Sequence, residues 1–482
     1  MARLIFFQLN HYELHGPESI SSVLSEHGHQ TRLVVPGLER DPLHAIEAEK
    51  PDVIGIGHTT AERQEALAWA RLFKKRTSAR VVLGGVDPTF QPELARDPAV
   101  DAVVRGEAEF PLLEIMDRAE ENKDLSDIES VAWSENGELR MSPVRPLVCD
   151  LDRLPFPDKD LYLGQYRYFR SYPIKFFMAS RGCPHGCTYC ANKGLRKLYP
   201  NPADYVRFKS PTYLAEEIKS VLAKYPARTV GFNDDLFTHD PDWLSEFLPR
   251  YKDEIGLPFF CTARIDTMTD EKARLLSEGG CYTCWYGLES AGEATRQAVL
   301  GRKMKNQDIR EGTRILHEHG ILTQSYNMLN IPGESVDDAL ETLRFNIELQ
   351  NDFVVASLFQ PFPGTELTRR LIEDGKLEDP DSYHGREALS YFAFSPFQQR
   401  DTRLHENLQK LFILGHRHPR LVPLIKKVLS LPKNPLFDIL FLGSFAIDYG
   451  RSHRLRPWEV VHYNLRHLWT TYLARNRKVP EG

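Results

Sequence analysis

The chain has 482 residues, of which 41% are hydrophobic and 27% are charged, and these fractions exclude a long disordered or fibrous chain. With 61 Lys and Arg residues against 67 Asp and Glu residues, the formal net charge is −6. This balance argues against a protein that coats nucleic acid, because phosphate binding requires a basic surface. No segment reaches the ~20 consecutive apolar residues of a membrane span, and the N-terminus lacks signal-peptide features. We therefore expect a cytoplasmic protein with no nucleic-acid partner and no stable membrane insertion.

The first 120 residues alternate short strand-like runs with amphipathic, helix-like segments. This alternation predicts an α/β domain with a doubly wound, Rossmann-like parallel sheet. The predicted strands are residues 3–9, 31–35, 52–57, 80–84 and 101–104. Ligands of such sheets bind beyond the carboxyl ends of the strands. The small and polar residues at those ends suit a ligand with phosphate or amide groups, although ordinary turns have the same composition: Thr59, Gly84, Gly85, Gly106 and Glu107.

The pattern changes after this domain. Asn136-Gly137 predicts a tight hairpin turn, and a Pro-rich segment follows it. From Lys175, six predicted strands alternate with helices, which indicates a parallel β/α barrel or part of one. The predicted organisation is a first domain over 1–145, a linker over 146–172, a core over 173–370 and a mostly helical C-terminal region over 371–482.

Three of the seven cysteines, Cys183, Cys187 and Cys190, lie within eight residues of one another. In a reducing compartment such clustering indicates metal binding or catalysis rather than disulfides. The C-x3-C-x2-C spacing after a predicted strand can hold three irons of a 4Fe–4S cluster and leave the fourth iron open for chemistry. A zinc site with His185 is the alternative, but His185 lies between two of the cysteines, which would strain a tetrahedral shell.

This loop resembles the one that defines the radical SAM superfamily. The resemblance to the cobalamin-binding branch of that superfamily covers roughly residues 1 to 370 and includes several independent motifs. The matching segments are residues 81–89 and 103–109 in the first domain and 231–237, 263–266, 286–290, 328–335 and 361–366 in the core. The branch usually has glycine where this chain has Asn330, and asparagine tolerates positive φ, so the turn is expected to survive.

The resemblance implies that the three cysteines hold a 4Fe–4S cluster, which binds S-adenosylmethionine and cleaves it reductively to a 5′-deoxyadenosyl radical. Tyr189 matches the aromatic position near the adenine, and Arg264 and Glu289 match residues that contact the methionine and ribose parts. Structural ion pairs at the barrel rim are the alternative for Arg264 and Glu289. Of Asp234 and Asp235, one is expected to face the site while the other forms a turn or cap.

The same resemblance implies that the first domain binds cobalamin at Thr59, Gly84, Gly85, Gly106 and Glu107. The D-x-H-x-x-G motif that supplies a histidine to cobalt is absent, as it generally is in this branch, and His15 and His58 do not lie in such a motif. We therefore expect cobalamin bound without histidine ligation. A domain that has lost cobalamin and persists as a scaffold is the alternative.

Cys281 and Cys284 form a second C-x2-C. On a regular strand residues three apart point to opposite faces, so we do not expect them to share a metal. We interpret them, with Cys149 and Cys261, as buried thiols. An auxiliary cluster is the alternative.

Together these features predict a cobalamin-dependent radical SAM enzyme that methylates an unactivated carbon or phosphorus of a small molecule. Methylcobalamin would hold the methyl group, and an external donor of the flavodoxin or ferredoxin type would supply electrons. A radical cyclase or rearrangement enzyme, a non-catalytic sensor and a tRNA-modifying enzyme are the alternatives. The C-terminal region is expected to close over the barrel mouth, with aromatic residues in its helical core: Tyr391, Phe392, Phe394 and Phe397.

Overall fold

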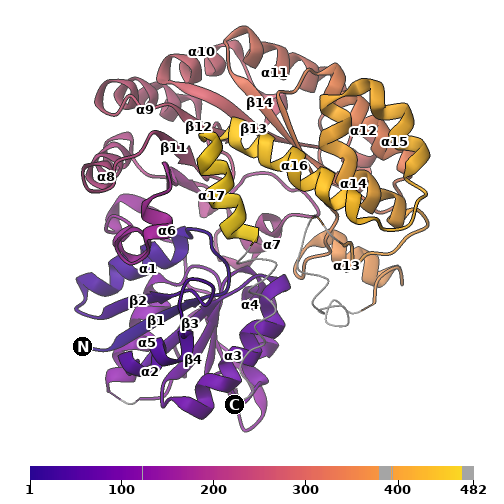
Figure 1. Ribbon diagram of the computed structural model, residues 1–482. Coiled ribbons are helices and arrows are strands. Elements are labelled where there is room, and N and C mark those ends of the chain that lie inside the picture. The colour runs from indigo at the N-terminus through magenta and orange to yellow at the C-terminus, as the bar shows by residue number, and fades with distance from the viewer. Residues whose placement is uncertain (122, 379–391, 393, 469–482) are drawn as a thin grey trace.

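The computed structural model describes residues 1–482 apart from 122, 379–391, 393 and 469–482. An N-terminal α/β domain lies below a second parallel sheet, and a helical C-terminal region packs beside and across that sheet (Figure 1). The predicted fold class is confirmed. No helix within the described residues has both the length and the apolarity that crossing a membrane requires.

The first sheet has seven strands in the order β2-β1-β3-β4-β5-β6-β7. It is parallel through β5, and β6 and β7 add an antiparallel hairpin. The boundaries of the first five strands fall within one residue of those predicted. The strands are β1 (Arg3–Gln8), β2 (Gln30–Val34), β3 (Val53–Gly57), β4 (Arg80–Gly84), β5 (Ala102–Val104), β6 (Val131–Glu135) and β7 (Glu138–Met141).

Helices cover both faces of this sheet, as β1 shows. Leu4 and Phe6 pack in one core with α1 (His15–Glu26) and α5 (Glu109–Glu120). Ile5 and Phe7 pack in a second core, on the opposite face, with α2 (Pro42–Glu49) and α3 (Arg63–Arg76). A strand buried on both faces has a continuous apolar run, and each such side chain contributes about 1.5–3 kcal/mol of stability.

The second sheet has six parallel strands in the order β15-β14-β13-β12-β11-β8, so the strands neighbour one another in chain order and the barrel stays open. The strands are β8 (Ile174–Phe177), β11 (Thr229–Phe232), β12 (Phe259–Ala263), β13 (Cys281–Glu289), β14 (Leu322–Leu329) and β15 (Phe353–Leu358). The connecting helices are α8 (Pro211–Lys224), α9 (Pro241–Glu254), α10 (Asp270–Gly279), α11 (Asn306–Glu318) and α12 (Val336–Glu348).

A bulge at the start of β13 contradicts our prediction that Cys281 and Cys284 point to opposite faces. Phe259 pairs with Cys281, but the next residue of β12 pairs with Thr283, so the register shifts there. Both thiols are buried in the same core as Cys261, whose Sγ lies 3.9 Å from that of Cys281. Bulges re-aim side chains in this way. The prediction that Cys149 is buried is also wrong, since that thiol is exposed.

In the part of the C-terminal region that the structure describes, the regular elements are helices, beginning with α13 (Glu366–Glu373). Helices α16 (Pro435–Ser452) and α17 (Pro457–Leu468), in yellow, cross in front of the second sheet (Figure 1). At the end of α16, His453 packs against Phe260 and Trp285 of the sheet, at ring-centroid distances of 5.5 and 5.3 Å. Between α13 and α16 lie helices α14 (Thr402–Arg417) and α15 (Val422–Val428).

The predicted aromatic core of this region is seen in part. Phe397 is buried and Phe392 packs partly buried beside Phe441. Phe394 instead lies under the ammonium group of Lys433. Tyr391 lies outside the described residues.

Candidate functional site

The three clustered cysteines lie on one loop that joins β9 (Ser180–Arg181) to α7 (Ala191–Leu198), beyond the carboxyl end of β8. All three are free thiols; Cys187 is buried, and Cys183 and Cys190 are half-buried. The path of the loop depends on Gly182, which has φ of +86°, and a Cβ there would lie 2.2 Å from a backbone oxygen. Only glycine fits such a position without moving the neighbouring chain.

Nitrogen donors lie beside the thiols. Nη1 of Arg302 is 3.7 Å from Sγ of Cys187, and Nδ2 of Asn192 is 3.8 Å from Sγ of Cys190. Donors aimed at sulfur stabilise an iron–sulfur cluster, which takes one thiolate per iron, so this donor set fits a 4Fe–4S cluster. In the part of the chain that the structure describes, no three His, Cys, Asp or Glu side chains converge to hold one metal ion, as a zinc site would require.

Tyr189 and Glu289 meet at this loop. The Tyr189 hydroxyl donates to Oε1 of Glu289 at 2.9 Å and accepts from Nη1 of Arg302 at 3.2 Å. Burial raises the pKa of Glu289, and the Arg302 guanidinium and the Tyr189 hydroxyl oppose that rise. Glu289 ends β13 with φ of +70°, a left-handed conformation that turns the chain at the sheet edge. Arg302, which also donates to the Gly287 carbonyl at 2.6 Å, was absent from our sequence-based site.

Arg264 lies in the turn after β12, with its side chain largely buried. Its Nε donates to Oδ1 of Asp266 at 2.8 Å, so the ion pair we gave as the alternative does form. Among the described residues its Nη1 and Nη2 make no hydrogen bond. A guanidinium held through Nε with its two Nη groups free retains the geometry to bind a carboxylate.

Asp234 and Asp235 have different surroundings. Asp234 is buried and accepts hydrogen bonds from the Ser180 amide and hydroxyl and from the Ala179 amide. Burial raises the pKa of Asp234 to about 6, against those hydrogen bonds. Its oxygens therefore hold the chain that leads into the cysteine loop. Asp235 is exposed and accepts at 2.9 Å from Nδ2 of Asn192, the same nitrogen that approaches Cys190.

The carboxyl ends of the first sheet leave open space. A Cβ at Gly84 would meet no atom within 4 Å, and the same holds for Gly57. Gly85, at φ of +101°, packs closely instead, since its Cβ would lie 3.0 Å from the His58 carbonyl oxygen. Thr59 precedes a short 3-10 turn (Thr60–Glu62), and its amide donates to Oε2 of Glu62 at 2.9 Å. Open space above two glycines fits a large ligand such as a corrinoid.

His15 and His58, two of the histidines of this domain, are engaged by carboxylates. Nδ1 of His58 lies 3.5 Å from Asp87, and both side chains are fully buried. Nδ1 of His15 lies 3.1 Å from Oε2 of Glu18. Burial lowers the pKa of both histidines. Cobalamin held here without either histidine is compatible with these contacts.

Gly106 and Glu107 do not face the open space beyond the strands. They contact residues of the core domain over 173–370. Glu107 accepts from Nη2 of Arg207 at 2.6 Å and pairs with Nη1 of Arg181 at 3.2 Å. Its amide donates to the Tyr199 hydroxyl at 3.1 Å, and a Cβ at Gly106 would lie 2.5 Å from that hydroxyl. Arg181 precedes the cysteine loop and Tyr199 follows α7, so this turn of the first domain holds both ends of the cysteine segment.

Phe90 makes a second contact between the domains. It ends α4 (Val86–Phe90) of the first domain. A Cβ at Gly364, which has φ of +75°, would lie 2.2 Å from its ring, and a Cβ at Gly194 of α7 would lie 2.9 Å from it. The ring therefore fits against two positions that have no side chain.

Two family models match the chain. The B12 binding domain matches residues 15–116, and the radical SAM superfamily matches residues 178–345. The chain is 28% identical to the uncharacterized methyltransferase PH0819 of Pyrococcus horikoshii, over 69% of this chain and 72% of that protein. It is 22% identical to cytidylyl-2-hydroxyethylphosphonate methyltransferase of Streptomyces wedmorensis (72% of each chain) and 23% identical to anaerobic magnesium-protoporphyrin IX monomethyl ester cyclase of a Synechocystis strain (74% and 73%).

Two solved structures share the fold. The radical S-adenosylmethionine methyltransferase TsrM from Kitasatospora setae superposes with a TM-score of 0.66 at 16% identity, covering 89% of this chain and 99% of that one. The cobalamin-dependent S-adenosylmethionine radical enzyme OxsB superposes with a TM-score of 0.67 at 15% identity, covering 99% and 80%.

A chain with both family matches is a cobalamin-binding radical SAM enzyme. The protein thus belongs to the radical SAM superfamily and has a B12-binding domain before the radical SAM core. Its cofactors are a 4Fe–4S cluster, S-adenosylmethionine and cobalamin.

Proposed function

We propose that this enzyme is a methyltransferase that transfers a methyl group to an unactivated carbon or phosphorus of a small-molecule substrate. The observation that carries the proposal is the direct contact between the B12-binding domain and the strand that leads into the cysteine loop, through the pairing of Glu107 with Arg181. When bound, the cluster and S-adenosylmethionine supply radical chemistry and cobalamin carries a methyl group. The similarity to two methyltransferases supports the same assignment.

Within this proposal each site residue has a role that its contacts allow. Cys183, Cys187 and Cys190 hold the cluster. The free Nη groups of Arg264 bind the carboxylate of S-adenosylmethionine, and Glu289 accepts from its ribose hydroxyls. The Tyr189 hydroxyl fixes the Glu289 carboxylate, while the buried Cys187 and the residues around it exclude water.

The carboxyl edge of the second sheet and the corrinoid domain are also compatible with a radical cyclase or rearrangement enzyme that uses S-adenosylmethionine only as a radical source. The similarity to the anaerobic cyclase keeps this second candidate open. An external electron donor of the flavodoxin or ferredoxin type belongs to both candidates, since the cluster must be reduced before it cleaves S-adenosylmethionine.

Product analysis tests the proposal. The full chain is reconstituted anaerobically with iron, sulfide and cobalamin, supplied with reductant and S-adenosylmethionine, and assayed for 5′-deoxyadenosine and S-adenosylhomocysteine. We expect both products from the native chain and from Cys149→Ala, which removes an exposed thiol outside the loop. We expect neither from Cys187→Ala. Formation of deoxyadenosine alone favours the cyclase. If the chain is shown to hold its cluster and still forms neither product, the catalytic assignment is contradicted.

A further inference from the structure

Asn330 stands at the turn that follows β14, where its backbone is left-handed, with φ of +62°. This conformation favours glycine, and asparagine is among the few other residues that tolerate it. The residue is also completely buried, with 0% of its surface exposed. Burying a polar side chain at a position that suits glycine is unfavourable unless the amide forms compensating hydrogen bonds.

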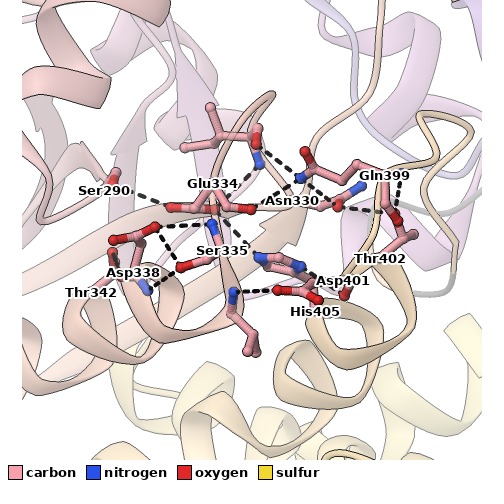
Figure 2. Close-up of polar contacts among 12 residues, drawn as sticks. Ser290, Asn330, Glu334, Ser335, Asp338, Thr342, Gln399, Asp401, Thr402 and His405 are labelled. Atoms are coloured by element: carbon pink, nitrogen blue, oxygen red, sulfur yellow. Dashed lines mark hydrogen bonds and ion pairs between the residues drawn. The ribbon is translucent and has the colours of Figure 1, made fainter. Parts of the chain in front are cut away.

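The Asn330 amide uses its full hydrogen-bonding capacity, and every partner belongs to the C-terminal region. Its Nδ2 donates to Oγ of Ser395 at 2.9 Å and to the Phe397 carbonyl at 2.8 Å. Its Oδ1 accepts from Nε2 of Gln399 at 2.9 Å and from Oγ1 of Thr402 at 3.2 Å (Figure 2). One buried side chain of the core therefore binds four positions of the C-terminal region. We call residues 395–405 the docking segment.

Gln399, in the docking segment, makes further polar contacts with the backbone of the turn after β14. Its Nε2 also lies within hydrogen-bond distance of the Ile331 and Glu334 carbonyls, at 3.0 and 3.3 Å. Its Oε1 accepts from the Gly333 amide at 3.1 Å. The backbone of the turn after β14 is thus bonded to the docking segment at several successive residues.

Glu334 connects this turn to Ser290, which follows strand β13 (Figure 2). Its side chain is fully buried, and Oε1 accepts from Oγ of Ser290 at 3.3 Å. Its Oε2 lies 3.8 Å from Nε2 of His405, in the docking segment. Nδ1 of His405 is 2.9 Å from the Asp401 carbonyl, which favours the tautomer with an unprotonated Nε2 toward Glu334. Ser290 directly follows Glu289, so the path ends at the site.

We infer that Asn330 is a positioning residue, through which the docking segment holds the turn after β14 and, by way of Glu334 and Ser290, sets the position of Glu289. This assigns a function to part of the C-terminal region: it completes the edge of the core at which S-adenosylmethionine is proposed to bind. The last step rests on the proposed function, whereas the docking of residues 395–405 by Asn330 does not.

Asn330→Gly is the direct test, because glycine keeps the left-handed turn and removes only the amide. Asn136→Gly is the matched control: Asn136 also has a positive φ, of +55°, but lies exposed in the β6–β7 hairpin. Two properties of the reconstituted full chain are measured, namely amide hydrogen exchange of residues 395–405 and S-adenosylmethionine affinity, read from the EPR signal of the reduced cluster.

In Asn330→Gly we expect exchange in the docking segment to accelerate by about tenfold or more and S-adenosylmethionine affinity to fall by about threefold to tenfold. The cluster signal without S-adenosylmethionine should keep its native shape, and Asn136→Gly should match the native chain in every measurement. If Asn330→Gly does not fold, Gln399→Ala replaces it with the same expectations.

Native exchange and native affinity in the variant overturn the inference. Faster exchange with unchanged affinity overturns its last step, from the docking segment to Glu289. If the native chain itself shows no response of the cluster to S-adenosylmethionine, the proposed function fails, and the exchange comparison still decides whether Asn330 holds the docking segment.

Discussion

The hydroxyl of Tyr189 lies 2.9 Å from Oε1 of Glu289, although the two residues are 100 positions apart in the chain. Tyr189 stands between two of the clustered cysteines and Glu289 ends strand β13. The bond therefore fastens the cysteine loop to the carboxyl edge of the sheet. Arg302 donates to the same hydroxyl at 3.2 Å and approaches Cys187, so Tyr189, Glu289 and Arg302 form one partly buried unit.

Tyr189→Phe removes the hydroxyl from this unit and leaves the ring. Hydrogen bonds to charged groups contribute about 1.5–3 kcal/mol, so loss of the constraint on Glu289 should weaken S-adenosylmethionine binding by about tenfold. The cluster should still assemble, as measured by its visible absorbance. Tyr286→Phe is the matched control, because the Tyr286 hydroxyl bonds Asn351 on the buried face of the sheet. Equal binding by Tyr189→Phe and the native chain would contradict the role given to the hydroxyl.

Glu107→Gln tests the junction between the domains. Arg207 has only 5% of its side chain exposed, so removing the carboxylate leaves a buried guanidinium without its charged partner. Breaking a fully buried pair costs about 3–5 kcal/mol, and partial exposure of Glu107 reduces our expectation to about 2 kcal/mol of unfolding free energy. Glu135→Gln, which breaks an exposed pair with Arg140, should change it by less than about 0.5 kcal/mol. Denaturant unfolding of the full chain measures both, and equal effects contradict the prediction.

Local sequence patterns predicted most of the fold because each strand carries its own apolar run and each helix its own amphipathic period. Strand β4 has the predicted boundaries at both ends. The bulge in β13 escaped prediction, because nothing in the spacing of Cys281 and Cys284 signals the extra residue. Their shared face depends on how β13 pairs with β12, which is a tertiary contact.

The residues of the candidate site divide in the same way, into those that a local sequence pattern predicts and those that only a tertiary contact brings to the site. The cysteine spacing predicted the loop, because all three cysteines lie within eight residues of one another. Arg302 reaches Cys187 from 115 residues away and belongs to no motif, so no local signal marked it. We expected Glu107 to contact cobalamin in the first domain. Its short motif gave no indication that Arg181 and Arg207 of the core domain would pair with it.

Gly364→Ala tests the fit of Phe90 between the domains. The new methyl group would collide with the Phe90 ring and would also strain a left-handed backbone. We expect a loss of about 3 kcal/mol of unfolding free energy. Gly375→Ala is the control, because Gly375 has a similar φ of +65° but open space around it, and should lose only the backbone part, about 1 kcal/mol.

A double-mutant cycle with Phe90→Ala separates the collision from the strain. Removing the ring should relieve Gly364→Ala but not Gly375→Ala, with a coupling energy of about 1–3 kcal/mol for the first pair and near zero for the second. Additive effects at Gly364 would show that the Phe90 contact does not limit this position.

Glu334→Gln gives a pH-dependent prediction. Burial raises the pKa of Glu334 to about 8, from an ordinary value near 4.5, against hydrogen bonds from the Ile331 amide and Ser290. The groups that face it are His405, whose pKa burial lowers, and Asp338, which opposes its ionisation. The carboxyl is therefore neutral in the folded chain at pH 7, and glutamine imitates that neutral form.

Between pH 4.5 and 8 the folded chain keeps a proton on Glu334 that the unfolded chain releases, so the contribution of this residue to stability is full below pH 4.5 and is lost as pH rises toward 8. The native chain should lose stability relative to Glu334→Gln by about 1 kcal/mol per pH unit across that window, and the difference should level off above pH 8. Every other titrating group is common to both chains, so the difference between their unfolding free energies isolates Glu334. A difference that is constant from pH 4.5 to 8 means that the Glu334 carboxyl ionises normally in the folded protein.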